Sequence, residues 1–365
     1  MKTAELDYDL PEALIATQPA EPRDSARLMV FRREPGTVEH CHVRDLPDLG
    51  VVGPGDLMLV NQTRVLPAYL TATRAATGGK ITGLYLDSPS DRVWRVMLES
   101  RGKLTPGETI TLDNYATLTL QTREDGGQWL AKLDSEDDTL AVLHRLGTTP
   151  LPPYIRRARK HRGGPEIDDT DRERYNTVYA GSRDHAHSVA APTAGLHFTP
   201  ALLERLSTQG VHRAAVDLHV GAGTFAPVRV DDLNDHPMHA EHLSIPASTI
   251  ATIHTTREQG KRILAIGTTT VRATESLPAD FATLTETPDT PDYTADTNLF
   301  IQPDAGFTFR FTDALLTNFH LPRSTLLALV AALPGVGIDR LLDLYRQAID
   351  RNYRFYSYGD AMLIV

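Results

Sequence analysis

Three histidines lie among small residues and prolines, a setting that can support proton-transfer chemistry. His197 ends the segment "SVAAPTAGLH", His219 precedes "VGAGTF", and His320 follows "TNF". Loops of glycine, alanine and proline let a ligand approach the backbone closely and meet free N–H groups. Imidazole exchanges protons near neutral pH. Each feature alone is typical of a tight connection with a surface histidine, but the repeated combination predicts a ligand site.

The segment "LHVGAGTFAPV" has the glycine spacing of a dinucleotide-binding loop, with Gly221 and Gly223 as its first two glycines. Such a loop must open a helix, whereas Pro227 falls inside the expected helix and disfavours helical backbone at the residue before it. We therefore interpret the glycines as a strand end that admits a ligand to the backbone, with His219 and Thr224 beside it. A β-bulge or bend without a ligand is the alternative.

The segment "HPMHAEH" places His236, His239, Glu241 and His242 close together. These side chains are suitable zinc or iron ligands. The spacing lacks the helical pair of an H-E-x-x-H site, and Pro237 interrupts any helix. We therefore favour hydrogen-bonding roles for these residues and keep a metal site as the alternative.

The segment "GTTTVRATES" follows an apolar strand pattern and starts a predicted helix. Thr268 and Thr269 stand at the turn, and Arg272 and Glu275 follow about one turn later. Free N–H groups and the helix dipole at such a turn suit a carboxylate or a phosphate. Helix capping by threonine without a ligand is the alternative, and both can hold together.

Two further segments near the C-terminus combine polar and aromatic residues. "TNFHLPRSTL" places Asn318 and Arg323 around His320, before a helix capped at Ser324. "YRFYSYGDAML" contains Tyr353, Arg354 and Asp360 among other aromatic residues. Packing explains most of those rings, but an aromatic face also suits a stacked base or a sulfonium cation.

A basic segment, "RRARKHR", stands out in an acidic protein with a formal net charge of −10. It lies in a stretch from 151 to about 175 that is broken by proline and glycine, so we expect a mobile loop. A solvated loop is the usual meaning of such a run, and contact with a polyanion is the other interpretation. The candidate phosphate-binding residues are Arg156, Arg157, Arg159, Lys160 and Arg162.

Composition restricts the function classes. The chain has 365 residues, of which 41% are hydrophobic and 23% charged, as in ordinary globular proteins. Cys41 is the single cysteine, which excludes an internal disulfide and multi-cysteine zinc sites. The N-terminal residues lack a signal-peptide pattern and no apolar run approaches a membrane span, so we expect a cytoplasmic protein. Walker A, G-x-S-x-G and H-E-x-x-H motifs are all missing from the sequence.

The pattern of elements predicts two domains. Six short alternating segments between residues 68 and 133, separated by turn signals, predict a small antiparallel β-barrel or sandwich. Strand and helix patterns alternate after Pro150, with helices starting at Thr199–Pro200, at Pro246 and at Ser324. We therefore predict an α/β main domain with a mixed, barrel-like sheet, formed by residues 1–66 and 147–365. An inserted β-barrel domain occupies residues 67–146.

Taken together, these segments closely resemble the S-adenosylmethionine:tRNA ribosyltransferase-isomerase family of queuosine biosynthesis. The matching stretches occur in the family's order and span nearly the whole chain. They include "YDLPEALIATQPAEPRDSARLMV", "GDLMLVNQTRVLPA", "LPPYI", "DRERYNTVYA", "SVAAPTAGLHFT", "LHVGAGTFAPV", "HPMHAEH", "AIGTTTVRATES", "TNFHLPRSTLLALVAA" and "YRFYSYGDAML". Ten such stretches in series are highly specific.

The resemblance implies a reaction and its partners. The family moves the ribosyl part of S-adenosylmethionine onto 7-aminomethyl-7-deazaguanine at the wobble position of tRNA. The product is epoxyqueuosine, with adenine and methionine released. S-adenosylmethionine is then a co-substrate, and no metal or further cofactor is implied. We expect a monomer that binds this tRNA and no membrane.

The same resemblance suggests roles for the residues singled out above. A general base must remove a proton from the carbon beside the sulfonium, and the expelled adenine needs a proton. His197, His219 and His320 are the candidates as a group, with Glu241 and Asp360 to orient a histidine or hold the methionine ammonium. Arg272 or Arg323 can pair with the methionine carboxylate. The candidate substrate contacts are Thr193, Gly195, Gly221, Gly223, Thr224, Thr268, Thr269, Arg272, Glu275, Asn318, Arg323, Tyr353, Arg354 and Asp360.

The sequence departs from the family pattern at a few positions. Gln302 and Asp304 stand where a Tyr-Pro-Gly turn is expected, and Asn176 replaces a usual glutamine. These changes leave the candidate histidines intact but bear on the acceptor. A diverged paralogue that uses a different acceptor, or only binds tRNA, is therefore one alternative. A metal-dependent hydrolase built on "HPMHAEH" is the other.

Overall fold

Buried strands rich in leucine, valine and isoleucine form the centre of the protein. The computed structural model describes residues 1–165, 169–182, 186–221, 228, 230–238, 240–285, 290–303 and 305–365. Nine strands form one sheet in the order β15-β13-β12-β3-β14-β16-β17-β1-β2. Their bounds are β1 Arg27–Arg32, β2 Thr37–His42, β3 Leu57–Asn61, β12 His212–Leu218, β13 Glu241–Ile245, β14 Ile263–Ile266, β15 Tyr293–Thr297, β16 Ala314–Asn318 and β17 Ala361–Ile364.

The large sheet is mixed, as the sequence predicts. Strand β3 pairs in parallel with β12 and β14, and β14 pairs in parallel with β16. Strands β13, β15 and β2 pair antiparallel toward the two edges, and β17 runs antiparallel to β16. Every residue of β3, β14, β16 and β17 is buried, which is the pattern of strands covered on both sides.

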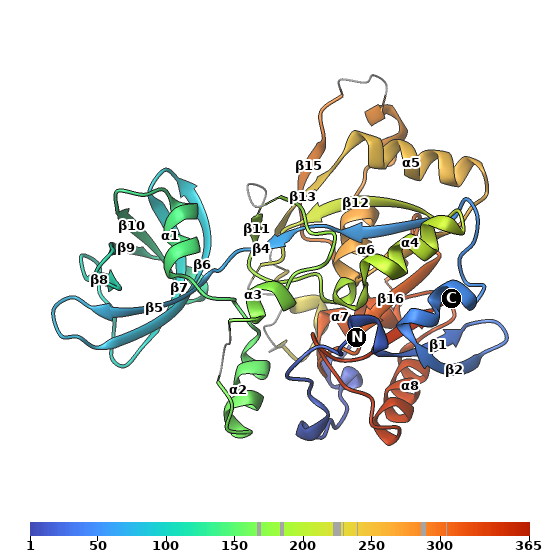
Figure 1. The fold of residues 1–365 in the computed structure, drawn as a ribbon, viewed down its shortest axis with the longest axis horizontal. Coiled ribbons are helices and arrows are strands. Elements are labelled where there is room, and N and C mark those ends of the chain that lie inside the picture. The colour runs from blue at the N-terminus through green and yellow to red at the C-terminus, as the bar shows by residue number, and fades with distance from the viewer. Residues whose placement is uncertain are drawn as a thin grey trace.

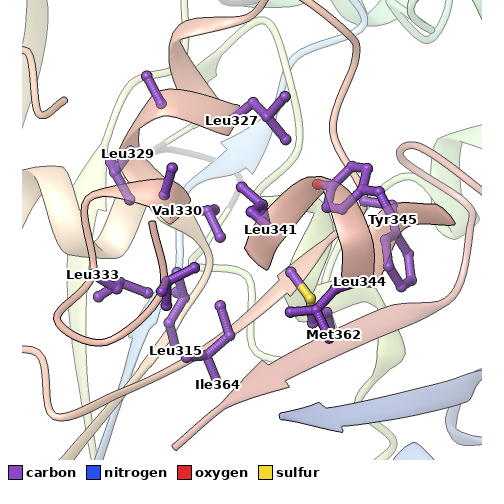
Figure 2. Close-up of a cluster of buried hydrophobic side chains, with 14 of the residues drawn as sticks. Leu315, Leu327, Leu329, Val330, Leu333, Leu341, Leu344, Tyr345, Met362 and Ile364 are labelled. Carbon is purple, nitrogen blue, oxygen red and sulfur yellow. The ribbon is translucent and has the colours of Figure 1, made fainter. Parts of the chain in front are cut away.

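Alternate residues of the strands face two different helical layers. Met362 and Ile364 of β17 belong to a core with helices α7 (Thr325–Ala331) and α8 (Ile338–Asp350), as Figure 2 shows. Ala361 and Leu363 of the same strand belong to a core with α4 (Pro200–Thr208). Because side chains of a strand alternate between faces, the sheet lies between these two layers. The α/β prediction is confirmed.

Helices α5 and α6 complete the main body, and their ends follow the expected rules. Helix α5 spans Ala247–Glu258 and α6 spans Thr268–Glu275. In α4, the Thr199 hydroxyl accepts a hydrogen bond from the N–H of Leu202 at 3.2 Å, as an N-cap should. Gly210 after this helix has φ of +80°, a conformation that glycine adopts without strain.

Six antiparallel strands form a closed barrel, in the order β10-β7-β6-β5-β8-β9. They are β5 Tyr69–Arg74, β6 Lys80–Ser90, β7 Val93–Ser100, β8 Thr109–Leu112, β9 Ala116–Arg123 and β10 Gln128–Asp134. Inward residues alternate with outward ones, and helix α1 (Thr139–Leu146) adds Val142 and Leu143 to the same core as Trp94. Figure 1 shows the barrel set to one side of the large sheet. The predicted inserted barrel is confirmed.

The two chain segments that join the barrel to the main body are held together. Tyr69 and Thr148 exchange two backbone hydrogen bonds, of 3.1 and 2.9 Å. A side chain at Gly147 would collide with the carbonyl oxygen of Pro67, so only glycine fits this close approach. Near this junction, β4 (Arg64–Val65) pairs in parallel with the short strand β11 (Ala186–Ser188).

The basic segment forms helices rather than the mobile loop that we predict from its proline and glycine. Helix α2 runs over Pro153–His161 with proline at its first turn, and α3 runs over Asp171–Arg174. Ile155, Ala158 and Arg159 of α2 are buried. Proline is well tolerated at a helix start, and the buried face of α2 supplies the packing that stabilises it.

Candidate active site

Residues at the carboxyl ends of three parallel strands, β12, β14 and β16, line a cavity of about 630 Å³, counted to its open mouth. In open α/β sheets this edge is where ligands bind, because the loops that leave the strands diverge there. The lining residues come from the loops that follow these strands and from three further segments. They are Tyr154, Ala191, Thr193, Ala194, Val220, Gly267, Thr268, Thr269, Thr317, Asn318, Phe319, His320, Leu321, Ser324, Leu326, Tyr356 and Ser357.

Asn61, the last residue of β3, fixes the spacing of this edge. Its side-chain amide donates to the carbonyl oxygen of Leu218 at 3.0 Å, and its side-chain oxygen accepts from the N–H of Thr63 at 3.1 Å. The amide also lies 3.4 Å from the hydroxyl of Thr269. The residue is fully buried. Sequence reasoning missed it, since a single asparagine after an apolar run carries no sign of these distant partners.

His320 lines the cavity, and only one of its two ring nitrogens has a hydrogen-bond partner among the described residues. Its Nε2 lies 2.8 Å from the hydroxyl of Thr317, and its backbone N–H donates to the Tyr345 hydroxyl at 2.9 Å. No hydrogen bond to Nδ1 is present in the described part of the chain. Burial lowers the pKa of His320 from 6.5 to about 4, because the charged imidazolium loses its hydration. The imidazole is therefore neutral near pH 7.

His197 is buried but both of its ring nitrogens are engaged. Nδ1 lies 2.9 Å from the carbonyl oxygen of Ala194, and Nε2 lies 2.9 Å from that of Gly359. Burial lowers the pKa of His197, and the two carbonyl contacts oppose this shift. His197 does not line the cavity described above. Through its contact with Gly359, it connects the 3₁₀ helix Thr193–His197 to the C-terminal turn.

Asp360 anchors the C-terminal turn from within. Its carboxylate accepts the backbone N–H groups of Arg27 at 3.1 Å and Arg354 at 2.8 Å, and it also pairs with both guanidinium groups. Tyr353 is buried, with its hydroxyl 2.8 Å from Nδ1 of His40. Tyr353, Arg354 and Asp360 thus hold the turn and do not line the cavity.

Two tyrosines form an aromatic wall of the cavity. Tyr154 and Tyr356 have ring centroids 4.7 Å apart, and the Tyr154 hydroxyl lies 2.6 Å from that of Ser357. Tyr356 has φ of +72°, a strained conformation for a side-chain-bearing residue. Strain of this kind concentrates at ligand sites, where the surrounding structure maintains it. Here the anchored turn maintains it.

A second cavity, of about 520 Å³, adjoins the first. Leu326 lines both. Glu241 and Arg272 form a buried ion pair in its wall, and the N–H of Gly221 donates to Glu241 at 3.3 Å. Arg272 Nε also donates to the carbonyl oxygen of Leu299 at 3.1 Å. The other lining residues are His236, Met238, Phe300, Ile301, Thr325 and Leu329.

Several predicted contacts come together at the first cavity. Thr193 donates its hydroxyl hydrogen to the side-chain oxygen of Asn318 at 2.9 Å, and both residues line the cavity with Thr268 and Thr269. Gly195 lies in the same loop, but a Cβ there would fall 2.1 Å from the Tyr179 hydroxyl. That glycine therefore serves close packing.

Two predicted contacts lie outside both cavities. Glu275 is buried and accepts hydrogen bonds from the N–H groups of Arg310 and Phe311 at 2.8 and 3.0 Å, so it holds the segment before β16. Arg323 is 54% exposed and pairs with Asp7. Neither residue lines a cavity.

Other predicted residues are only partly described. Gly223, Thr224, His239 and Asp304 lie outside the described residues. His219 directly follows β12, is half-buried, and its ring centroid lies 5.4 Å from that of His242. Within the described ranges, no three His, Cys, Asp or Glu side chains are grouped as ligands for a metal ion.

Neither of the two described departures from the family pattern lines one of the two cavities. Asn176 accepts the N–H of Val65 at 3.0 Å and so helps to hold β4. Gln302 donates to the side-chain oxygen of Asn234 at 2.7 Å.

The five basic residues of α2 and its end have different surroundings. Arg159 is buried and binds Asp171 through two hydrogen bonds, of 2.6 and 2.8 Å, so its charge is already neutralised. Arg156 lies over the Tyr69 ring, 4.3 Å from its centroid. Arg162 is exposed and donates to the carbonyl oxygen of Ile15 at 3.1 Å. Arg157 and Lys160 are exposed on the helix.

Known proteins share this architecture over the full chain. A family model described as "Queuosine biosynthesis protein" matches residues 3–364. An S-adenosylmethionine:tRNA ribosyltransferase-isomerase of Thermotoga maritima is 43% identical over 365 residues, which cover 100% of both chains. One of Acidithiobacillus ferrooxidans is 46% identical over 365 residues, covering 100% of this chain and 98% of the relative.

A solved structure agrees with the sequence matches. The crystal structure of S-adenosylmethionine tRNA ribosyltransferase from Thermotoga maritima covers 99% of this chain and 100% of its own, with a TM-score of 0.52 and 34% sequence identity. The fold and the cavities define an α/β protein with an inserted antiparallel barrel and a ligand site at its strand ends. This chain belongs to the queuosine biosynthesis family. Among its described residues, no helix is long and apolar enough to cross a membrane.

Proposed function

We propose that the protein transfers and isomerises the ribosyl moiety of S-adenosylmethionine onto 7-aminomethyl-7-deazaguanine at the wobble position of tRNA. The products are epoxyqueuosine-tRNA, adenine and methionine. Family membership over residues 3–364 and relatives with this enzyme name support the proposal. The observation that carries it is the cavity at the carboxyl ends of three parallel strands, with a neutral histidine and an aromatic wall.

His320 is the proposed proton-transfer residue. Its neutral imidazole can accept the proton from the carbon beside the sulfonium. The resulting imidazolium is a stronger acid than an exposed one because burial disfavours its charge, so it can pass the proton to the departing adenine nitrogen. His197 is proposed as a brace, since both of its nitrogens contact carbonyl oxygens.

Several residues around His320 are proposed to position the substrate. Thr193, Asn318, Thr268 and Thr269 line the same cavity, and their hydroxyl and amide groups suit ribose or nucleobase contacts. His219 is the second candidate for proton transfer, because the next two residues, Val220 and Gly221, each line one of the cavities.

Helix α2 is proposed to contact tRNA. Tyr154, near its start, lines the cavity, while Arg157 and Lys160 are exposed further along the helix. A basic helix beside the cavity mouth can hold phosphates while the target base enters the site. Arg156 and Arg162 flank this surface. Arg159 is left out, because its guanidinium is buried against Asp171.

The proposal includes the organisation of the chain. We propose residues 67–146 as an inserted domain and residues 1–66 with 147–365 as the catalytic domain; the barrel strands and α1 all fall between Tyr69 and Leu146. We also propose a cytoplasmic monomer that uses no metal or further cofactor. Light scattering of the purified protein checks the oligomeric state, and metal analysis checks the metal content.

One experiment tests the activity. The purified protein is incubated with S-adenosylmethionine and tRNA that carries the deazaguanine precursor, without added metal, and released adenine is measured by chromatography. We expect adenine in proportion to modified tRNA. No adenine under conditions where the tRNA is bound would overturn the proposal. Adenine release with a different acceptor only would support the diverged paralogue.

A further inference from the structure

The second cavity contains a buried arginine whose hydrogen bonding is incomplete. Arg272 Nη1 binds Glu241 and its Nε binds the carbonyl oxygen of Leu299. Its Nη2 is buried and has no hydrogen-bond partner among the residues that the structure describes. An unsatisfied buried donor on a charged group is costly, so native structures seldom leave one without a ligand or a partner.

The rest of the cavity wall indicates what kind of ligand would take this nitrogen. Arg272 and Glu241 contribute one positive and one negative charge, and both are buried. A zwitterion matches such a wall, because each of its charges meets the opposite one. The remaining lining is largely apolar, with Met238, Leu299 and Phe300 among its residues. An α-amino acid with an apolar side chain fits both features.

The position of the cavity connects this ligand to the first cavity. Leu326 lines both cavities, and Val220 and Gly221, which are adjacent in the chain, line one each. A single extended ligand can therefore occupy both. The first cavity has the aromatic and hydroxyl groups that suit a nucleoside.

We propose that the second cavity binds the amino-acid half of S-adenosylmethionine, with Arg272 Nη2 taking the carboxylate and Glu241 facing the ammonium group. This inference rests on the proposed function for the identity of the ligand. It selects Arg272 over Arg323, which is exposed and paired with Asp7. In this proposal the two cavities bind different halves of one substrate.

The decisive comparison uses a ligand that lacks only the carboxylate. Equilibrium dialysis measures the binding of labelled S-adenosylmethionine and of its decarboxylated analogue. The samples contain saturating tRNA without the deazaguanine base, so that no turnover occurs. We expect the wild-type protein to prefer S-adenosylmethionine by about 10- to 100-fold, the range of one charge-assisted hydrogen bond.

Two variants assign the preference to Arg272. Arg272→Lys keeps a positive charge beside Glu241 but loses the guanidinium fork, so S-adenosylmethionine should bind about tenfold or more weakly while the analogue is little affected. Arg257→Lys is the matched control. Arg257 also binds one carboxylate, Asp313, and one carbonyl oxygen, and its Nε has no partner among the described residues. It lines neither cavity.

Each outcome supports or overturns the inference. Equal wild-type binding of both ligands overturns it, and this result does not depend on how well any variant folds. Equal weakening of both ligands in Arg272→Lys also overturns it, because that pattern shows a structural role. Adenine release by the wild-type protein tests the proposed function separately, so a preserved binding preference without turnover would leave this inference standing while the reaction fails.

Discussion

Two buried arginine–carboxylate pairs in this protein differ in how completely they are satisfied. Arg159 and Asp171 have side chains that are 5% and 0% exposed, and Arg272 and Glu241 have side chains that are 7% and 4% exposed. Arg159 uses all three nitrogens, on both oxygens of Asp171 and on the carbonyl oxygen of Thr17. Arg272 Nη2 has no hydrogen-bond partner in the described part of the chain.

Two buried histidines show the same contrast. Both ring nitrogens of His197 contact carbonyl oxygens, whereas within the described residues the ring of His320 makes one hydrogen bond, with Thr317. His320 and Arg272 line the cavities, while His197 and Arg159 do not. Burial alone therefore does not separate structural from functional groups here. In both comparisons, the residue that lines a cavity is the one with hydrogen-bonding capacity left over for a ligand.

The histidine contrast yields the largest expected effect. We expect His320→Gln to lower adenine release by about 10²- to 10⁴-fold, the usual contribution of acid–base catalysis, with little loss of stability. His197→Gln should instead lower the free energy of unfolding by about 1–3 kcal/mol and leave the rate per folded molecule nearly unchanged. Single-turnover kinetics and urea unfolding check both variants. The reverse pattern would break the contrast.

The arginine contrast predicts a large loss of stability when the fully hydrogen-bonded pair of Arg159 and Asp171 is broken. Asp171→Ala removes the partner of a buried guanidinium and should lower the free energy of unfolding by about 3–5 kcal/mol, measured by urea denaturation. Asp343→Ala, which breaks an exposed pair with Arg346, is the control and should change stability by less than about 1 kcal/mol. If Asp171→Ala kept its stability but lost ligand binding, Arg159 would be a ligand-binding residue like Arg272, and the contrast would fail.

Acid should weaken the folded state through His320. Its pKa falls from 6.5 to about 4 on folding, so the folded protein binds this proton less readily than the unfolded chain. The associated stability is present above pH 6.5 and is lost as the pH falls toward 4, by about 3 kcal/mol at pH 4. Urea titrations of the wild type and His320→Gln should diverge over this window. Parallel curves would contradict the burial of a neutral imidazole.

The smallest expected effect concerns the exposed residues of α2. Arg157→Ala with Lys160→Ala should weaken tRNA binding and reduce the slope of log affinity against log salt by about 2, one for each lost phosphate contact. Filter binding at several salt concentrations measures this slope. Arg346→Ala, an exposed change on α8, is the control. An unchanged slope would place the tRNA surface elsewhere.

Local patterns in the sequence predicted much of the fold. Turn signals delimited the six barrel strands, and Thr199 and Ser324 marked helix starts that the structure has. These predictions succeed because capping and turn formation depend on neighbouring residues. Helix α2 was missed, since its stability depends on burying one face against distant segments.

The candidate site was only partly predictable, because its contacts join distant segments. The sequence identified His320 and Asn318 from their loop, but it could not distinguish His320 from His197. That distinction needs Gly359, which approaches His197 only in the folded chain. For the same reason, the sequence gives no sign of the role of Asn61, and it wrongly suggests Arg159 as a phosphate-binding residue. Their roles are set by Leu218 and Asp171, partners that spacing in the sequence does not indicate.

The pairing of strands also constrains the order in which the protein folds during synthesis. The barrel comes from one continuous stretch, Tyr69 to Asp134, so it can fold as soon as this stretch leaves the ribosome. Strand β3 must wait for β12 and β14, and β1 pairs with β17, where Leu28 lies opposite Ala361. Such distant pairings form slowly. The strand ends that line the cavities are therefore assembled late, next to a barrel that is already folded.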